Sequence, residues 1–154
     1  MHIQRLIFIW FLCNIGFAVQ SRGTQQPSFD ALRKEIEKME SNRDSALSLS
    51  RIYIQKSKKE NNIYEMLYGW KMAAYFTENA KMKIKYTDSC IATALESKDD
   101  HMIASAYITK GTVCYFSLRD YKDALDQFEI AQKYAEHSKD EYQIYKIHYC
   151  TSSN

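Results

Sequence analysis

Small and apolar residues recur three or four positions apart between residues 104 and 138, with a break at residues 118–120. This spacing places them on one face of each of two helices. A glycine inside a helix costs about 1 kcal/mol relative to alanine, so we expect Gly111 to lie where the two helices approach closely. The recurring positions are Ala104, Tyr107, Ile108, Gly111, Thr112 and Tyr115 before the break, and Ala124, Leu125, Phe128, Ala131 and Ala135 after it.

Three polar segments of similar sequence divide the rest of the chain. Residues 57–60 read SKKE, residues 97–100 read SKDD and residues 138–141 read SKDE, so the segments recur at spacings of 40 and 41 residues. We expect each segment to end one helix and to supply polar or acidic caps for the next. The aromatic pair Tyr75-Phe76 also recurs 40 residues later. These matches in register indicate an array of helical repeats.

The chain from residue 29 onwards is predicted to be helical. It has only four glycines and one proline among 154 residues, which argues against a β-sandwich or a loop-rich enzyme. We therefore predict an all-α domain over residues 29–150, with capping pairs between Asn62 and Glu65 and between Ser41 and Asp44. The repeat units are about 29–60, 61–98 and 101–138, with a partial unit at 141–150. The apolar positions of that last unit are Tyr142, Ile144, Tyr145 and Tyr149.

The N-terminal segment is typical of a secretory signal peptide. Arg5 precedes an apolar run at residues 6–19. Roughly 14 apolar positions fit a signal sequence and fall short of the about 20 that span a bilayer. Small residues at Gly16 and Ala18 favour cleavage after Ala18, and cleavage after Gln20 is the near alternative.

We therefore predict a signal peptide at residues 1–18 and a polar linker at residues 19–28. The mature protein would then be exported to the periplasm or the cell envelope. In the alternative interpretation the segment is not cleaved, and residues 6–19 anchor the chain in the membrane. We expect contact with a membrane only through this segment.

Charge and motifs argue against several classes of function. A formal net charge of +2, mixed along the chain, is too small to indicate direct binding of nucleic acid. The sequence has no glycine-rich phosphate loop, no Cys-x-x-Cys pair and no His-Glu-x-x-His motif, so we expect no enzyme, cofactor or metal. His101 and His137 fall at predicted helix ends. Cys90, Cys114 and Cys150 remain after cleavage; Cys90 occupies a small buried position, and the odd count leaves intermolecular pairing open.

The last full unit resembles the tetratricopeptide repeat family. The residues on that family's consensus spacing are Tyr115, Tyr121, Ala124, Phe128 and Ala131. Thr112 occupies the position of the family's usual glycine, and Glu136 stands where a proline often ends the unit. The middle unit is more degenerate, because Lys83 and Thr87 replace small and aromatic residues. The resemblance covers roughly residues 42–150 and implies helix pairs stacked into a curved solenoid, whose concave face is made by the first helix of each pair.

The resemblance also implies a peptide-binding groove on that concave face. The groove would be mildly apolar and almost uncharged, and it lacks the lysine and asparagine set that binds a C-terminal carboxylate in chaperone-binding relatives. We therefore expect an apolar or amphipathic protein or peptide partner. The alternative is that Phe76 and Phe116 are ordinary packing residues. The groove positions that the resemblance implies are Met66, Gly69, Ala73, Phe76, Thr77, Ala106, Thr109, Val113, Phe116 and Ser117.

A signal peptide followed by long tetratricopeptide-like units resembles the N-terminal part of bacterial envelope-located regulators. The resemblance implies a non-enzymatic binding module that serves as the sensor or interaction part of an exported or membrane-associated signalling or transcriptional regulator. No output domain follows residue 150, which a truncated product would explain. The alternative is a self-contained periplasmic adaptor that scaffolds envelope proteins. We also expect the helix at residues 141–150 to fray or to pair with a second copy of the chain.

Overall fold

The computed structural model describes residues 27–152, and every element within that range is a helix or a short connection, as the all-α prediction requires. The predicted signal peptide at residues 1–18 and most of the predicted linker lie outside the described residues. None of the helices in the described range combines the length and apolar character needed to cross a membrane.

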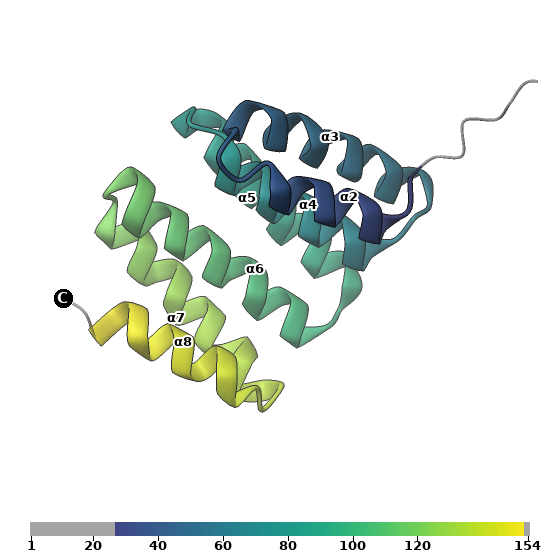
Figure 1. Ribbon diagram of the computed structural model, residues 1–154. Coiled ribbons are helices and arrows are strands. Elements are labelled where there is room, and N and C mark those ends of the chain that lie inside the picture. The colour runs from purple at the N-terminus through teal and green to yellow at the C-terminus, as the bar shows by residue number, and fades with distance from the viewer. Residues whose placement is uncertain (1–26, 153–154) are drawn as a thin grey trace, which may run out of the picture.

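Each helix packs against the next one along the chain, and the chain reverses direction at each short connection (Figure 1). Alternate helices also touch, because α4 contacts α6 and α6 contacts α8. The helices are α2 (Phe29–Lys38), α3 (Arg43–Lys59), α4 (Ile63–Phe76), α5 (Ala80–Ser97), α6 (Asp100–Thr112), α7 (Tyr121–His137) and α8 (Glu141–Ser152), and a π-helix, η1 (Val113–Leu118), extends α6.

The three polar segments form similar turns in the structure. In each, a buried or half-buried serine donates a hydrogen bond from its hydroxyl to the carbonyl three residues earlier: Ser57 to Ile54 at 2.9 Å, Ser97 to Ala94 at 2.5 Å and Ser138 to Ala135 at 3.1 Å. A residue with positive φ follows directly after Ser97 and Ser138, at Lys98 (55°) and Lys139 (55°), but lies four positions after Ser57, at Asn61 (50°). The next residue caps the following helix, namely Asn62, Asp99 and Asp140. The prediction that these segments end one helix and cap the next is confirmed for residues 97–100 and 138–141, whereas residues 57–60 end α3 and the cap of α4, Asn62, lies outside that segment.

One of the two predicted capping pairs is present and the other is not. Asn62 Oδ1 accepts a hydrogen bond from the Glu65 backbone N–H at 3.2 Å. The pair between Ser41 and Asp44 was the wrong prediction, because α3 begins one residue later than that pair requires. Asn42 caps α3 instead and accepts from the backbone N–H of Ser45 at 3.2 Å.

Three clusters of buried side chains hold the helices together, and many of their members are alanines that let helix backbones approach closely. On α7 the predicted apolar face is buried at Ala124, Phe128 and Ala131, whereas the prediction for Leu125 was wrong, since 49% of it is exposed. The reason is angular: residues that directly follow one another point about 100° apart on a helix, and Gln127 rather than Leu125 shares the buried face.

The prediction for the last helix placed its apolar side wrongly. Tyr142, Tyr145 and Tyr149 are exposed, and α8 buries Gln143, Ile147 and Cys150 against α7 and α6. The buried residues are four and three positions apart and therefore share one face. Gln143 is tolerated in this face because its Nε2 donates to the carbonyl of His101 at 3.1 Å.

Candidate binding site

The predicted groove positions fall into two groups in the structure. Gly69, Ala73, Phe76, Thr77 and Ala106 are buried between helices. At Gly69, for example, a Cβ atom would lie 2.7 Å from Cγ1 of Ile54 in α3. Met66 is half-buried on α4. The second group, Thr109, Val113, Phe116 and Ser117, lines a cavity of about 590 Å³.

This cavity lies between α4 and the α6–η1 segment, and its walls come from five α-helices and η1. A volume of this size is within the range of ligand-binding sites in proteins. We call it the basic cavity, because four of its lining residues are lysine or arginine. The lining residues are Arg43 from α3; Lys71, Met72, Ala74 and Tyr75 from α4; Lys83 from α5; Thr109 and Thr112 from α6; Val113, Phe116 and Ser117 from η1; and Lys146 from α8.

The π-helix η1 forms one wall of the basic cavity. A π-helix turn holds more residues than an α-helix turn, so the side chains that follow Thr112 point in directions that a continued α6 would not give them. Phe116 is thereby left 54% exposed on the cavity wall. The segment ends at Arg119, which has φ 59°, and the backbone N–H of Asp120 donates to the Cys114 carbonyl at 3.0 Å. π-Helix turns occur frequently at functional sites.

Cys114 of η1 is buried and its thiol is hydrogen-bonded within the protein. Its Sγ donates to Oδ2 of Asp123 at 3.0 Å. Burial, followed by this hydrogen bond and the negative charge of Asp123, raises the pKa of the Cys114 thiol to about 12. The thiol is therefore protonated at neutral pH. Cys90 and Cys150 are buried free thiols as well, and burial raises the pKa of each.

The expectation of an almost uncharged groove was wrong. The basic side chains come partly from α3 and α5, and the resemblance supplied no groove positions on those helices. It also passed over Lys71 on α4 and Lys146 on α8. Within residues 27–152 no acidic side chain lines this cavity.

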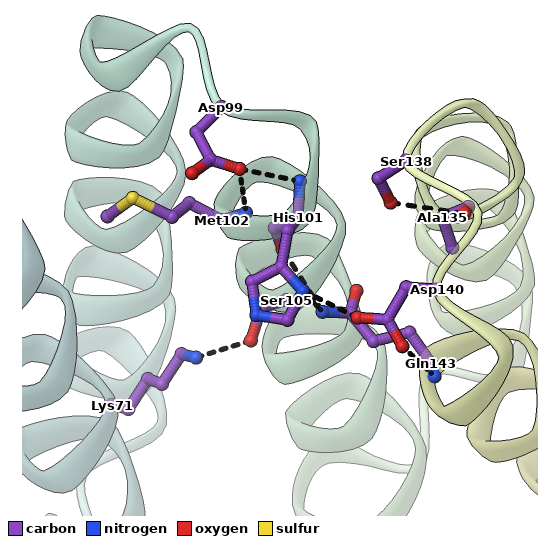
Figure 2. A network of polar contacts seen from close by, with 9 residues as sticks. All are labelled: Lys71, Asp99, His101, Met102, Ser105, Ala135, Ser138, Asp140 and Gln143. Atoms are coloured by element: carbon purple, nitrogen blue, oxygen red, sulfur yellow. Dashed lines mark hydrogen bonds and ion pairs between the residues drawn. The ribbon is translucent and has the colours of Figure 1, made fainter.

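Lys71 is the most buried of the four cations and lies between α4 and α6 (Figure 2). Its Nζ donates to Oγ of Ser105 at 2.5 Å. Burial lowers the pKa of Lys71, and the positive charge of Lys146 lowers it further. Its only hydrogen-bond partner among the described residues is thus a neutral hydroxyl.

Lys83 and Arg43 contact backbone carbonyls at the other side of the basic cavity. Lys83 Nζ donates to the carbonyl of Ala74 at 3.3 Å, and burial followed by the charge of Arg43 lowers the pKa of Lys83. Arg43 donates to the carbonyl of Tyr75, and its guanidinium carbon lies 5.4 Å from the centre of the Tyr75 ring. Its Nε is 3.5 Å from the carboxylate of the exposed residue Glu78.

A smaller cavity of about 130 Å³ adjoins the basic cavity along α4 and α6. Lys71 lines both, so the two cavities lie in a row along these two helices, one on either side of this side chain. The lining residues of the smaller cavity are Tyr64, Leu67, Tyr68, Lys71, His101, Met102 and Ser105.

A polar network fixes the start of α6 to the turn between α7 and α8. Nδ1 of His101 in α6 lies 2.5 Å from Oδ2 of Asp140, the residue before α8 (Figure 2). His137 at the end of α7 pairs with Asp100 at the start of α6. The prediction that both histidines lie at helix ends is confirmed. In the part of the chain that the structure describes, no three histidine, cysteine or acidic side chains come close enough to hold a metal ion.

Comparison of the chain with family models, with curated proteins and with solved structures finds no significant match. The chemistry of the site therefore rests on its own residues. They offer cations, hydroxyl groups and aromatic rings around an open cavity, which suits binding of an amphipathic ligand.

Proposed function

We propose that this chain is a non-enzymatic module of tetratricopeptide type, which binds a peptide segment of a protein partner along α4 and α6. The stacking of antiparallel helix pairs, with contacts between α4, α6 and α8, supports a solenoid whose first helices share one face. The matching turns at Ser97 and Ser138 support the repeat.

The observation that carries the proposal is the row formed by the two cavities that share Lys71. It follows the length of two neighbouring helices, which suits an extended or helical peptide better than a compact ligand. The exposed Phe116 ring and the half-buried Met72 side chain line the cavity and can contact the apolar side of an amphipathic segment.

The cellular setting of this module follows from the N-terminal segment and stays a prediction. An exported chain would present the two cavities to the periplasm, as the sensor or interaction part of an envelope-located regulator. The second candidate, a self-contained adaptor that scaffolds envelope proteins, uses the same surface.

A random-peptide display library screened against the full chain tests the proposal. We expect enriched peptides that reduce hydrogen exchange in α4 and α6. Phe116→Ala should weaken their binding about tenfold, whereas Tyr142→Ala, which removes an exposed aromatic ring from α8 outside the cavity, should not. Failure to enrich any peptide, or protection confined to α2 or α7, would contradict the proposal.

A further inference from the structure

Four cations from four different helices converge on the basic cavity. Arg43 comes from α3, Lys71 from α4, Lys83 from α5 and Lys146 from α8. Glu78 pairs with the first of these from an exposed position outside the cavity, and its negative charge also acts on Lys83. Within residues 27–152 the three lysines have no carboxylate within ion-pair distance.

A few lysines elsewhere on the molecule have acidic partners. Lys56 pairs with Glu60 at 2.6 Å and Lys110 pairs with Asp88 at 2.9 Å. Most other lysines of the described residues form no ion pair, so what distinguishes Lys71 and Lys83 is that they are half-buried and share one cavity with two further cations. Gathering like charges in a partly buried site is unfavourable unless an opposite charge enters.

Lys71 shows this most clearly. It is partly withdrawn from water, its hydrogen-bond acceptor is the neutral Ser105 hydroxyl, and the nearby charge of Lys146 has the same sign. A buried cation without a paired anion is costly, and a bound carboxylate would offset that cost.

The apolar lining of the two cavities indicates what kind of molecule carries the anionic group. Met72, Val113 and Phe116 give the basic cavity apolar surface, and Tyr64 and Tyr68 line the smaller cavity on the other side of Lys71. A free inorganic anion would contact the cations and leave this apolar surface without a partner. A peptide could contact the cations through an acidic side chain and the apolar surface through neighbouring apolar or aromatic residues.

We infer that the peptide partner of this site carries an internal aspartate or glutamate flanked by apolar residues, and that its carboxylate binds between Lys71, Lys83 and Lys146. This inference rests on the proposed function, because it names the chemistry of the partner at the same site. It narrows the expected apolar or amphipathic guest to an acidic, amphipathic one.

The peptide display experiment separates the two proposals. Enrichment of peptides in which aspartate or glutamate stands beside apolar residues supports the inference. Enrichment of apolar or basic peptides without an excess of acidic residues keeps the proposed function and overturns the inference. If no peptide is enriched, both are overturned.

Synthetic copies of an enriched peptide give the sharper measurement by calorimetric titration against the full chain. Replacing the peptide's acidic residue with its amide should weaken binding about tenfold or more, and so should Lys71→Gln or Lys83→Gln. The matched controls are Lys122→Gln and Lys85→Gln, which remove exposed lysines outside the basic cavity. They should leave the affinity within about twofold of the unmodified chain.

Two results would overturn the inference at this stage. In the first, Lys71→Gln and Lys83→Gln bind the peptide as tightly as their controls. In the second, inorganic phosphate alone binds as tightly as the peptide and displaces it, which would make the basic cavity a site for free anions. Circular dichroism of each variant should show unchanged helicity, so a loss of binding reports on the site and not on folding.

Discussion

The Phe128 ring of α7 lies directly against the backbone of Gly111 in α6. A Cβ atom at residue 111 would stand 2.7 Å from Cε1 and 2.8 Å from Cδ1 of this ring, closer than side-chain atoms normally approach. The packing role predicted for Gly111 is thus confirmed, and this contact sets the distance between the two helices.

Gly111→Ala should destabilise the chain, although alanine is the better helix former. The added methyl group must displace a buried ring, which costs about 1–3 kcal/mol in a packed core. Chemical denaturation measures the effect. The control, Glu129→Ala on the exposed side of α7, should change the free energy of unfolding by less than about 0.5 kcal/mol. An equal or higher denaturation midpoint for Gly111→Ala would show that Phe128 can move freely.

Lys71→Met should stabilise the chain while it abolishes the proposed peptide binding. Burial lowers the pKa of Lys71, so the folded chain binds fewer protons than the unfolded chain as the pH approaches the ordinary lysine value. The penalty for the charged form is present at neutral pH and is relieved as pH rises through the lowered pKa. The variant should gain about 1 kcal/mol near pH 7, and the gain should shrink towards about pH 10. A destabilised variant at neutral pH would indicate a structural role for the charge.

Asp140→Ala should loosen α8 from the rest of the chain. The Asp140 carboxylate accepts from the backbone N–H of Gln143 and contacts His101, and these two interactions hold its pKa below the usual range. Loss of the cap should cost about 1 kcal/mol and raise hydrogen exchange at Ile147. Asp140→Asn, which keeps a capping oxygen, should have a smaller effect.

The same carboxylate gives α8 a dependence on acid. Because the folded pKa of Asp140 is lowered, its stabilising effect is present above the ordinary value and is lost as pH falls through the lowered value. The protection factor of Ile147, the intrinsic exchange rate divided by its observed rate at the same pH, should therefore fall below about pH 4 in the unmodified chain. The exposed Asp126→Ala variant should follow the unmodified chain. A protection factor of Ile147 that is independent of pH would contradict the proposed role.

Lys139→Gly should stabilise the turn between α7 and α8. Lys139 is exposed and has a φ of 55°, a region that is unfavourable for side chains other than glycine. Relief of this strain should add about 1 kcal/mol to the free energy of unfolding. Lys133→Gly, inside α7, should instead lower it by about 1 kcal/mol. If both variants are destabilised alike, Lys139 makes a contact that outweighs its backbone strain.

Export can be checked by mass spectrometry of the envelope fraction. We expect the mature chain to begin at Val19, or at Ser21 if the alternative cleavage is used. Recovery of the intact chain from Met1 in the cytoplasm would contradict the prediction of a signal peptide. Intact chain in the membrane fraction would support the uncleaved anchor.

The helix boundaries and turns could be predicted because their causes are local. Asn62 caps a helix through an N–H only three residues away. At the end of α7, the Ser138 hydroxyl donates to the Ala135 carbonyl, which also lies three residues away. The side of α8 that is buried could not be predicted in the same way. Its three exposed tyrosines mimic an apolar stripe, and the buried Gln143 is satisfied by His101, which is distant in sequence.

The basic cavity could not be predicted for a related reason. Arg43 and Lys146 lie at opposite ends of the helical array, and each alone fits a solvated helix face. Their convergence follows from the stacking of helices. The repeat pattern gives the order of those helices, and it does not give the charges that meet between them.

The π-helix η1 separates two registers within one continuous segment. Residues up to Thr112 keep the α-helical register that holds Gly111 against Phe128, while Phe116 and Ser117 follow the wider turn of η1. A deletion or insertion of a single residue in η1 would therefore rotate the cavity wall and leave the contact between α6 and α7 in place. The length of this short segment thus decides which side chains line the cavity, and the buried Cys114 limits how far that length can change.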